Sequence, residues 1–178
     1  MTHTTKPQTI TILGAGIMGL TTALTLAQSG HTITIHDPNG FPNAQSASFI
    51  AGGMLAPYSE IEHMDMQWAN AGFESIKIWQ TLTQTLNLNT GFTQNGSLLI
   101  ACPSDQHILE RFKTHLPQNL QTPQNPHKFE PALAPKFRTA LYLKPEAHLN
   151  PKTTIQSLCK ALKSHPNVTL TTTPTFQN

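Results

Sequence analysis

The alternation of apolar and polar residues near the start of the chain predicts a strand–helix–strand unit. Residues 8–13 and 31–36 each alternate threonine with isoleucine, which is the two-residue period of a β-strand. Between them, residues 16–28 place apolar side chains at helical spacing, and Gly30 follows where a helix C-terminal cap is expected. A helix between two such strands is the crossover that parallel pairing requires. The pattern therefore favours an α/β fold with a parallel sheet.

Weaker patterns over the rest of the chain predict a further set of elements. Asn95-Gly96, just before an apolar run, is typical of a β-hairpin turn. Asn150 and Pro151 are typical of a helix cap followed by proline in the first turn. The other expected elements are a loop with a short helix at 41–57, helices at 65–88, 104–115 and 150–164, an irregular connection at 116–136, and strands at 98–101, 139–143 and 168–172.

Composition and charge exclude several classes of function. Only 11% of the 178 residues are charged, the net charge is +2 and no basic stripe is present, so we expect no nucleic-acid partner. Cys102 and Cys159 are far apart and the nine histidines form no cluster, which predicts buried thiols in a reducing, cytoplasmic compartment and no metal site. The nearly uncharged run 10–27 is short and interrupted by glycines, so we expect no membrane insertion.

Residues 13–19 carry the strongest chemical signal. They form a GxGxxG motif that follows a predicted strand and opens a predicted helix. Gly14 permits a tight turn, Gly16 lets a pyrophosphate approach the backbone, and Gly19 allows close helix–strand packing. Asp37, at the end of the next predicted strand, can accept hydrogen bonds from a ribose. Together these residues predict a site for a dinucleotide with an adenosine ribose, and several dinucleotides meet that description.

The motif and the block after it resemble a known family. Residues 14–37, followed at 46–57 by Ser-Ala-Ser-Phe-Ile-Ala-Gly-Gly-Met-Leu-Ala-Pro, resemble the flavin-dependent amine and amino-acid oxidases. Within that family the chain is most similar to the glycine oxidases of thiamine biosynthesis and the D-amino-acid oxidase group. The likeness continues at 96–101 and from 146 through 172, so it covers nearly the whole chain. It implies FAD as the cofactor.

The resemblance also implies a domain organisation. It predicts a Rossmann-like FAD-binding domain with a parallel sheet, built from the two segments 1–85 and 150–178. Residues 86–149 would form a partial substrate-binding domain with a mixed or antiparallel sheet. Only three candidate strands, near Gln8, Thr32 and Val168, look like members of the parallel sheet.

Roles for individual residues follow from the positions that match the family. The backbone of Ile17 and Met18 would lie against the pyrophosphate. Asp37 with Pro38 would lie against the adenosine ribose, where the family often has glutamate in place of Asp37. The other implied cofactor-binding residues are Gly14, Gly16 and Gly19 in the glycine loop, Ala47 and Ser48 near the phosphate and ribitol, Gly52, Gly53 and Met54 beside the isoalloxazine ring, and Thr175 near the adenine.

The activity that the resemblance implies is oxidation of a C–N bond. The substrate would be glycine, a D-amino acid or a secondary amine, with hydride transfer to flavin N5 and oxygen as the acceptor. Family members are much longer, and the part that this chain lacks carries the arginine that holds the substrate carboxylate. We therefore expect an N-terminal portion of such an enzyme and assign no catalytic residue.

The expected partner is the small amine or amino-acid substrate, with a separate C-terminal half or a homo-oligomer as open alternatives. Two alternatives to the activity stay open. The chain could be an inactive or split FAD-binding fragment that needs a separate C-terminal half. It could also be an NAD-dependent dehydrogenase, a reading that rests on the same glycines and Asp37 but leaves the block 46–57 unexplained.

Overall fold

The computed structural model describes residues 6–173, except for the side chain of His63. Contacts divide these residues into two compact units. The first unit comprises 6–53, 82–91 and 150–173, and the second comprises 54–81 and 92–149. Within the described part of the chain, no helix is both long and apolar enough to cross a membrane.

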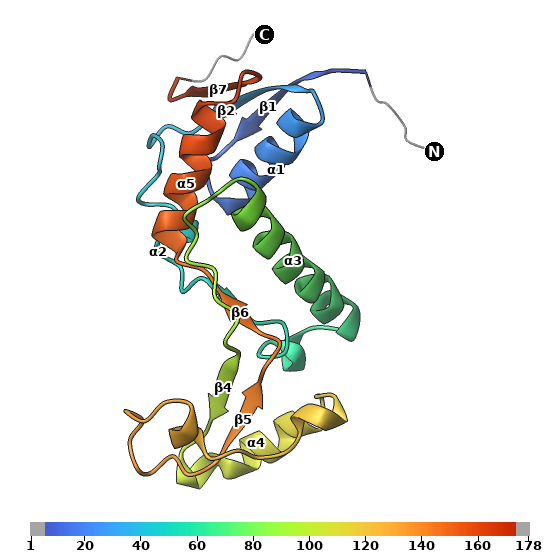
Figure 1. The fold of residues 1–178 in the computed structure, drawn as a ribbon, viewed down its shortest axis with the longest axis vertical. Helices are drawn as coiled ribbons and strands as arrows, with labels where there is room; N and C mark the ends of the chain where they lie inside the picture. The colour runs from blue at the N-terminus through green and yellow to red at the C-terminus, as the bar shows by residue number, and fades with distance from the viewer. Residues whose placement is uncertain (1–5, 174–178) are drawn as a thin grey trace. The chain divides into compact units, whose positions relative to one another are not determined.

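The first unit contains a three-stranded parallel sheet (Figure 1). Its strands are β1 (Thr9–Leu13), β2 (Thr32–His36) and β7 (Val168–Thr171), in the order β1-β2-β7. Both pairings are parallel, as the strand–helix–strand pattern predicted. The helices of this unit are α1 (Ile17–Gln28), the short α2 (Ala47–Ile50) and α5 (Pro151–Lys163), which Asn150 caps by accepting a hydrogen bond from Thr153 N–H at 3.2 Å.

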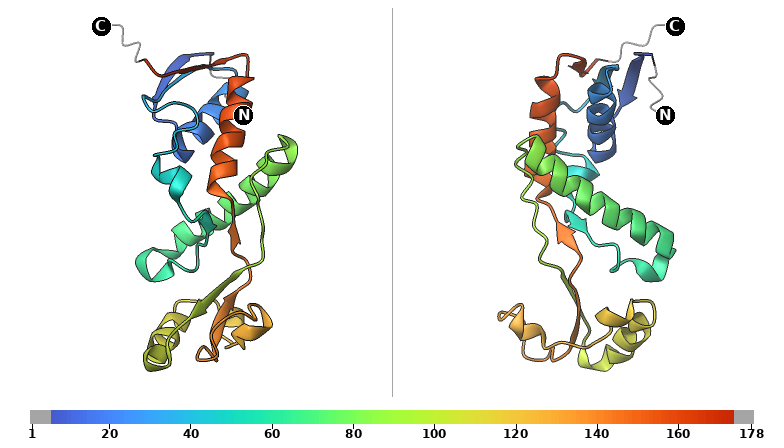
Figure 2. Two further views of the ribbon diagram at one scale, coloured as in Figure 1. Left: turned by 90° about the vertical axis from the view of Figure 1, so that its left-hand side faces the viewer. Right: turned by 45° about the vertical axis from the view of Figure 1, so that its right-hand side comes forward.

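The two faces of this sheet differ sharply in composition. Side chains paired across parallel strands point to the same side, so the alternation along each strand separates isoleucine from threonine. On the isoleucine face, Ile33 and Ile35 of the central strand are fully buried. Helices α1 and α5 lie side by side (Figure 2) and contribute buried leucines to the same core. The opposite side, here called the threonine face, presents Thr9, Thr11, Thr32, Thr34, Thr169 and Thr171.

The second unit is built on antiparallel pairs. Strand β4 (Ser97–Ile100) pairs with β5 (Ala140–Leu143), and the short β3 (Met54–Leu55) pairs with β6 (Ala147–His148). Helix α4 (Gln106–Lys113) packs its Leu109 and Phe112 into an apolar core with β5 residues Leu141 and Leu143. Short 3-10 turns at Ile61–His63, Pro103–Asp105, Gln118–Leu120 and Pro126–Lys128 complete the unit, and the long helix α3 (Met66–Thr85) contributes residues to both units.

The hairpin predicted at Asn95-Gly96 is wrong. Strand β4 does not pair with the residues just before this dipeptide but with β5, about forty residues later. Gly96 does adopt the positive φ (75°) that such turns favour, and its N–H donates to the carbonyl of Glu146 at 3.0 Å. The dipeptide therefore bends the chain from the bridge at Thr93 into β4 rather than closing a hairpin.

The two units are defined by contacts within the structure, whereas the predicted domains are defined by what they would bind. Contacts place residues 54–81 in the second unit and 86–91 in the first, whereas the prediction assigned both segments the other way. The prediction concerns which segments bind the cofactor and which bind the substrate, so its boundaries stay a prediction. The α/β class with a parallel sheet is confirmed.

Candidate nucleotide-binding site

The glycine loop joins β1 to α1 at the carboxyl end of the sheet. Gly14 has a φ of +97°, a backbone conformation that residues other than glycine rarely adopt. Its N–H donates to the carbonyl of His36 at 2.7 Å. Gly16 is the N-cap of α1. A Cβ on Gly19 would collide with the carbonyl oxygen of Gly14, so the helix can start this close to the loop only with glycine there. The tight turn and close packing predicted for Gly14 and Gly19 are therefore present.

The first turn of α1 offers backbone donors to an anion. A helix leaves its first N–H groups without intrahelical partners, and these carry the positive end of the helix dipole. The N–H of Ile17 donates to Ser48 Oγ at 3.0 Å, which brings α2 up to the start of α1. A Cβ on Gly16 would lie 3.3 Å from the same hydroxyl oxygen. Because Ser48 accepts from Ile17, its own O–H is left to donate, so the hydroxyl extends the row of donors.

Asp37 is buried, with 4% of its surface exposed, and it lies at the end of β2 as predicted. Its Oδ2 accepts from Ala15 N–H at 2.8 Å, and its Oδ1 accepts from Asn39 N–H at 3.0 Å. Burial alone would raise the pKa of this carboxyl, but these hydrogen bonds, the amide of Asn43 and the nearby His36 outweigh it, so the pKa lies below its ordinary value. The carboxylate thus stays ionised and holds the glycine loop against the end of β2.

Asn43 is a member of this site that the sequence reasoning missed. Its Nδ2 lies 3.1 Å from both carboxylate oxygens of Asp37, and its Oδ1 accepts from Gln45 N–H at 3.0 Å. With Ala15 and Asn39, this side chain fills the acceptor positions of Asp37 that were expected to face a ribose. The only signal in the sequence was an asparagine in a loop beside proline, which ordinarily indicates a turn.

The other predicted cofactor-binding residues differ in where they lie. Met18, in the first turn of α1, is 76% exposed, and Pro38 and Ala47 are also exposed in the same unit. Gly52 and Gly53 end the first segment of that unit, and Gly53 has a φ of +73°. Met54 begins β3 in the second unit and is 63% exposed, and Thr175 lies outside the described residues.

The two cysteines are free thiols in different surroundings. Cys159, on α5, is buried as expected, and burial together with the negative charge of Asp37 raises the pKa of its thiol to about 11. Cys102, which was also predicted to be buried, is only half-buried in the second unit. A thiol with so high a pKa holds almost no thiolate at neutral pH, so Cys159 is a structural residue.

In the second unit, a buried carboxylate ties the segment after β3 to the turn before β6. Glu146 is fully buried, and its two oxygens accept from Ser59 N–H at 2.7 Å and from Ser59 Oγ at 2.8 Å. The adjacent Tyr58 packs against Phe73, with ring centroids 4.6 Å apart. Burial, and then the negative charge of Glu146, raise the pKa of Tyr58. Tyr58 is therefore held in place by its packing against Phe73.

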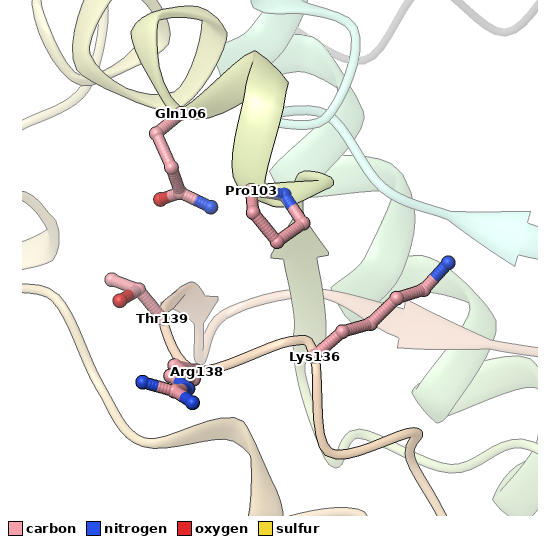
Figure 3. A pocket seen from close by; sticks show the side chains of 5 residues that line it. All are labelled: Pro103, Gln106, Lys136, Arg138 and Thr139. Atoms are coloured by element: carbon pink, nitrogen blue, oxygen red, sulfur yellow. The ribbon is translucent and has the colours of Figure 1, made fainter.

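A pocket of about 460 Å³ in the second unit contains two cationic side chains (Figure 3). Lys136 and Arg138 line it with Pro103, Gln106 and Thr139. Figure 3 shows the side chain of Lys136 directed away from Gln106 and Thr139, and its ammonium lies 5.0 Å from the centroid of the Phe137 ring. The two charges do not converge on one point, so this pocket lacks the arrangement that binds an anion.

Comparisons with known proteins concern the family and the fold of this chain. The sequence model of the FAD dependent oxidoreductase family matches residues 9–173. A thiamine biosynthesis oxidoreductase of Rhizobium etli, named ThiO, is 31% identical over 155 residues, which cover 86% of this chain and 46% of that protein. The fold is similar to that of a glycine oxidase from Geobacillus kaustophilus (TM-score 0.78, 20% identity, 93% of this chain and 47% of that chain). It is also similar to an iminodiacetate oxidase from Chelativorans (TM-score 0.70, 21% identity, 90% and 46%).

These comparisons also bear on length. The chain spans about half the length of the curated relative and of both solved structures that it matches. The matched half of the relative is its N-terminal part. The predicted resemblance and the Rossmann-like fold are thereby confirmed.

Proposed function

This chain belongs to the FAD dependent oxidoreductase family, and from that premise we propose that its first unit binds the adenosine diphosphate part of FAD, as the N-terminal portion of an amine-oxidising enzyme. The names of the relatives support the substrate class. Glycine and iminodiacetate both carry an amine nitrogen on a carbon next to a carboxylate. The proposed substrate is therefore a small amino acid or secondary amine, and a cytoplasmic location stays a prediction.

The observation that carries the proposal is the arrangement at the start of α1. The conformation of Gly14 and the lack of a side chain on Gly16 leave the backbone open to a diphosphate, and the helix N-terminus provides donors and a positive potential. Ser48 adds a hydroxyl donor at the same place. The residues present fit a dinucleotide diphosphate.

Each implied residue has a role in holding the cofactor. The backbone of Ile17 and Met18, with the hydroxyl of Ser48, would bind the diphosphate, which requires Ile17 N–H to share its hydrogen bond with Ser48 Oγ. Ala47 would lie beside the diphosphate. Asp37 and Pro38 would border the adenosine ribose, which requires Asn43 to give up its hydrogen bonds to Asp37 or to share them through water. The remaining proposed contacts are Gly52, Gly53 and Met54 at the ring and Thr175 at the adenine.

FAD, when bound, would supply an acceptor for the hydride that leaves the substrate carbon next to the nitrogen, and dioxygen would be the final electron acceptor, leaving as hydrogen peroxide. The part of the reaction that this chain contributes is binding and orientation. No side chain of the described residues is assigned as a base.

Titration of the purified chain with FAD, followed by flavin fluorescence, tests the proposal. We expect saturable binding that Gly16→Ala weakens by about tenfold or more, because its methyl group would occupy the approach to the diphosphate. Thr22→Ala, an exposed change later in the same helix, is the matched control and should bind as the wild type does.

Binding of NAD without any affinity for FAD would contradict the proposal and favour the nicotinamide-dependent dehydrogenase. Bound FAD without peroxide formation across glycine, D-amino acids and secondary amines would agree with it, and would mean that this chain alone is a binding fragment and not the oxidase.

A further inference from the structure

The carboxylate of Asp37 has its hydrogen-bond positions filled by this chain. An ionised carboxylate is only an acceptor, with about four lone-pair positions on its two oxygens. One position on each oxygen is filled from the backbone, by Ala15 N–H at 2.8 Å and Asn39 N–H at 3.0 Å. The Nδ2 of Asn43 lies 3.1 Å from each oxygen and fills the other two. Because Asp37 is also buried, a further donor can bind it only by replacing one of these three groups.

Of the three donors, the amide of Asn43 is the one that can be replaced. Ala15 N–H belongs to the glycine loop and Asn39 N–H to the turn after β2, so neither can leave without a change in the backbone. The amide of Asn43 is a side-chain group, and a change of rotamer removes it. It is a donor, as a ribose hydroxyl is, so the two compete for the same carboxylate oxygens.

The loop before α2 holds the side chain of Asn43 in this position. Its Oδ1 accepts from Gln45 N–H at 3.0 Å, and its backbone carbonyl accepts from Ser46 Oγ at 2.9 Å. Ser46 is the N-cap of α2, and its Oγ accepts from Phe49 N–H at 3.2 Å. Asn43 itself is 7% exposed. These bonds place the amide against Asp37 before any ligand reaches it.

Exchanging one donor for another on the same carboxylate changes the free energy of binding little. A ribose hydroxyl that replaces Asn43 Nδ2 forms a hydrogen bond to a charged acceptor, but a bond of the same kind is broken. The displaced amide must also find a new partner, and a buried amide without one costs free energy. The gain from the ribose is therefore offset within the chain.

We infer that Asn43 sets how strongly the adenosine ribose is recognised, because its amide competes with the ribose hydroxyls for Asp37. The ribose hydroxyls then add little to the affinity, which rests on the other parts of the nucleotide. The inference rests on the proposed function, since it requires an adenosine nucleotide to bind beside the glycine loop. It assigns a role in specificity to a residue that lies outside the glycine motif.

Titration of the 178-residue chain with ADP and with dideoxy-ADP, which lacks both ribose hydroxyls, tests the inference. We expect the two dissociation constants of the wild type to agree within about threefold. Asn43→Ser keeps an oxygen for Gln45 N–H but is too short to cover both carboxylate oxygens of Asp37. It should bind ADP about tenfold more tightly than the wild type and dideoxy-ADP equally, because the ribose then meets free acceptors. Asn89→Ser, an exposed change in the same unit, is the matched control and should bind both nucleotides as the wild type does.

A second measurement needs no variant. The side-chain NH₂ protons of Asn43, followed by NMR, should exchange with water faster when ADP is bound, because the amide has left Asp37. With dideoxy-ADP bound, they should exchange at the rate of the free chain, because no hydroxyl competes. Thermal denaturation shows whether Asn43→Ser folds, and the exchange rates decide the test if it does not.

Three outcomes would overturn the inference. In the first, the wild type prefers ADP to dideoxy-ADP by more than about threefold, so that the ribose is recognised with Asn43 in place. In the second, a folded Asn43→Ser binds both nucleotides as the wild type does. In the third, the Asn43 amide exchanges at the same rate with either nucleotide bound. A failure of the proposed function looks different: neither the wild type nor Asn43→Ser would bind ADP or dideoxy-ADP, and the inference would fall with it.

Discussion

At the scale of single residues, Asp37 joins three segments through one carboxylate. It accepts hydrogen bonds from Ala15 in the glycine loop, from Asn39 in the next turn and from Asn43 farther along. Removing its charge would leave backbone donors buried without an acceptor of matching strength. The residue proposed to meet the ribose is thus also the residue that fixes the shape of the loop.

We predict that Asp37→Asn lowers the free energy of unfolding by about 1–3 kcal/mol at neutral pH. The folded pKa of Asp37 lies below its unfolded value, so this contribution is present above the unfolded pKa and is lost as the pH falls through the folded pKa. Urea denaturation should therefore show a wild-type advantage that narrows at acidic pH. Asp65→Asn, at an exposed site, is the control, and an equal loss there or a gap constant with pH would contradict the prediction.

The pair formed by Glu146 and Ser59 permits a second test at this scale. We predict that Glu146→Gln costs about 2–3 kcal/mol, because the new amide group would face the donors of Ser59 in a buried site. Ser59→Ala should cost less, since it removes only the hydroxyl bond and keeps the backbone one. A double-mutant cycle measured by urea unfolding should show coupling. Additive effects, or an equal loss in the exposed Glu60→Gln control, would show that the two residues act independently.

At the scale of elements, the sequence predicts those strands and helices that are determined by residues close together in the chain. The strands and helices of the first unit agree with prediction because alternation, the glycine loop and the Asn150-Pro151 cap are all encoded within a few neighbouring residues. The pairing of β4 with β5 was not predicted, because its partner is distant and is selected by the apolar core around Leu141 and Leu143. Asn43 was missed for the same reason, since its partner is reached only through tertiary structure.

Helix α5 provides the prediction that belongs to this scale. Asn150→Ala should lower the free energy of unfolding by about 1 kcal/mol, because Thr153 N–H loses the side-chain oxygen that caps it. Asn150→Asp keeps a capping oxygen and should retain most of the stability. Thermal denaturation of the two variants measures the difference, and equal losses would mean that the cap is not what stabilises this end of the helix.

At the scale of the whole molecule, the proposed cofactor-binding residues do not all belong to one compact unit. The glycine loop, Asp37 and Ser48 lie in the first unit, whereas Met54 opens the second. Sequence alone could predict the glycine loop and the tight turn within it, because those residues are local to one strand–helix–strand unit. Which residues meet the ring and the substrate depends on how distant segments assemble, and no local pattern encodes that arrangement.

The threonine face determines what kind of layer can cover it. Burying a hydroxyl that loses water without gaining a hydrogen-bond partner costs about 1–3 kcal/mol of free energy. A purely hydrocarbon layer would therefore bind this face unfavourably. The six threonines carry no charge, and their methyl groups still reward close packing. A covering layer must therefore offer hydrogen-bond donors and acceptors at positions that match the threonine hydroxyls. Where the face is open to water, the same hydroxyls keep it hydrated.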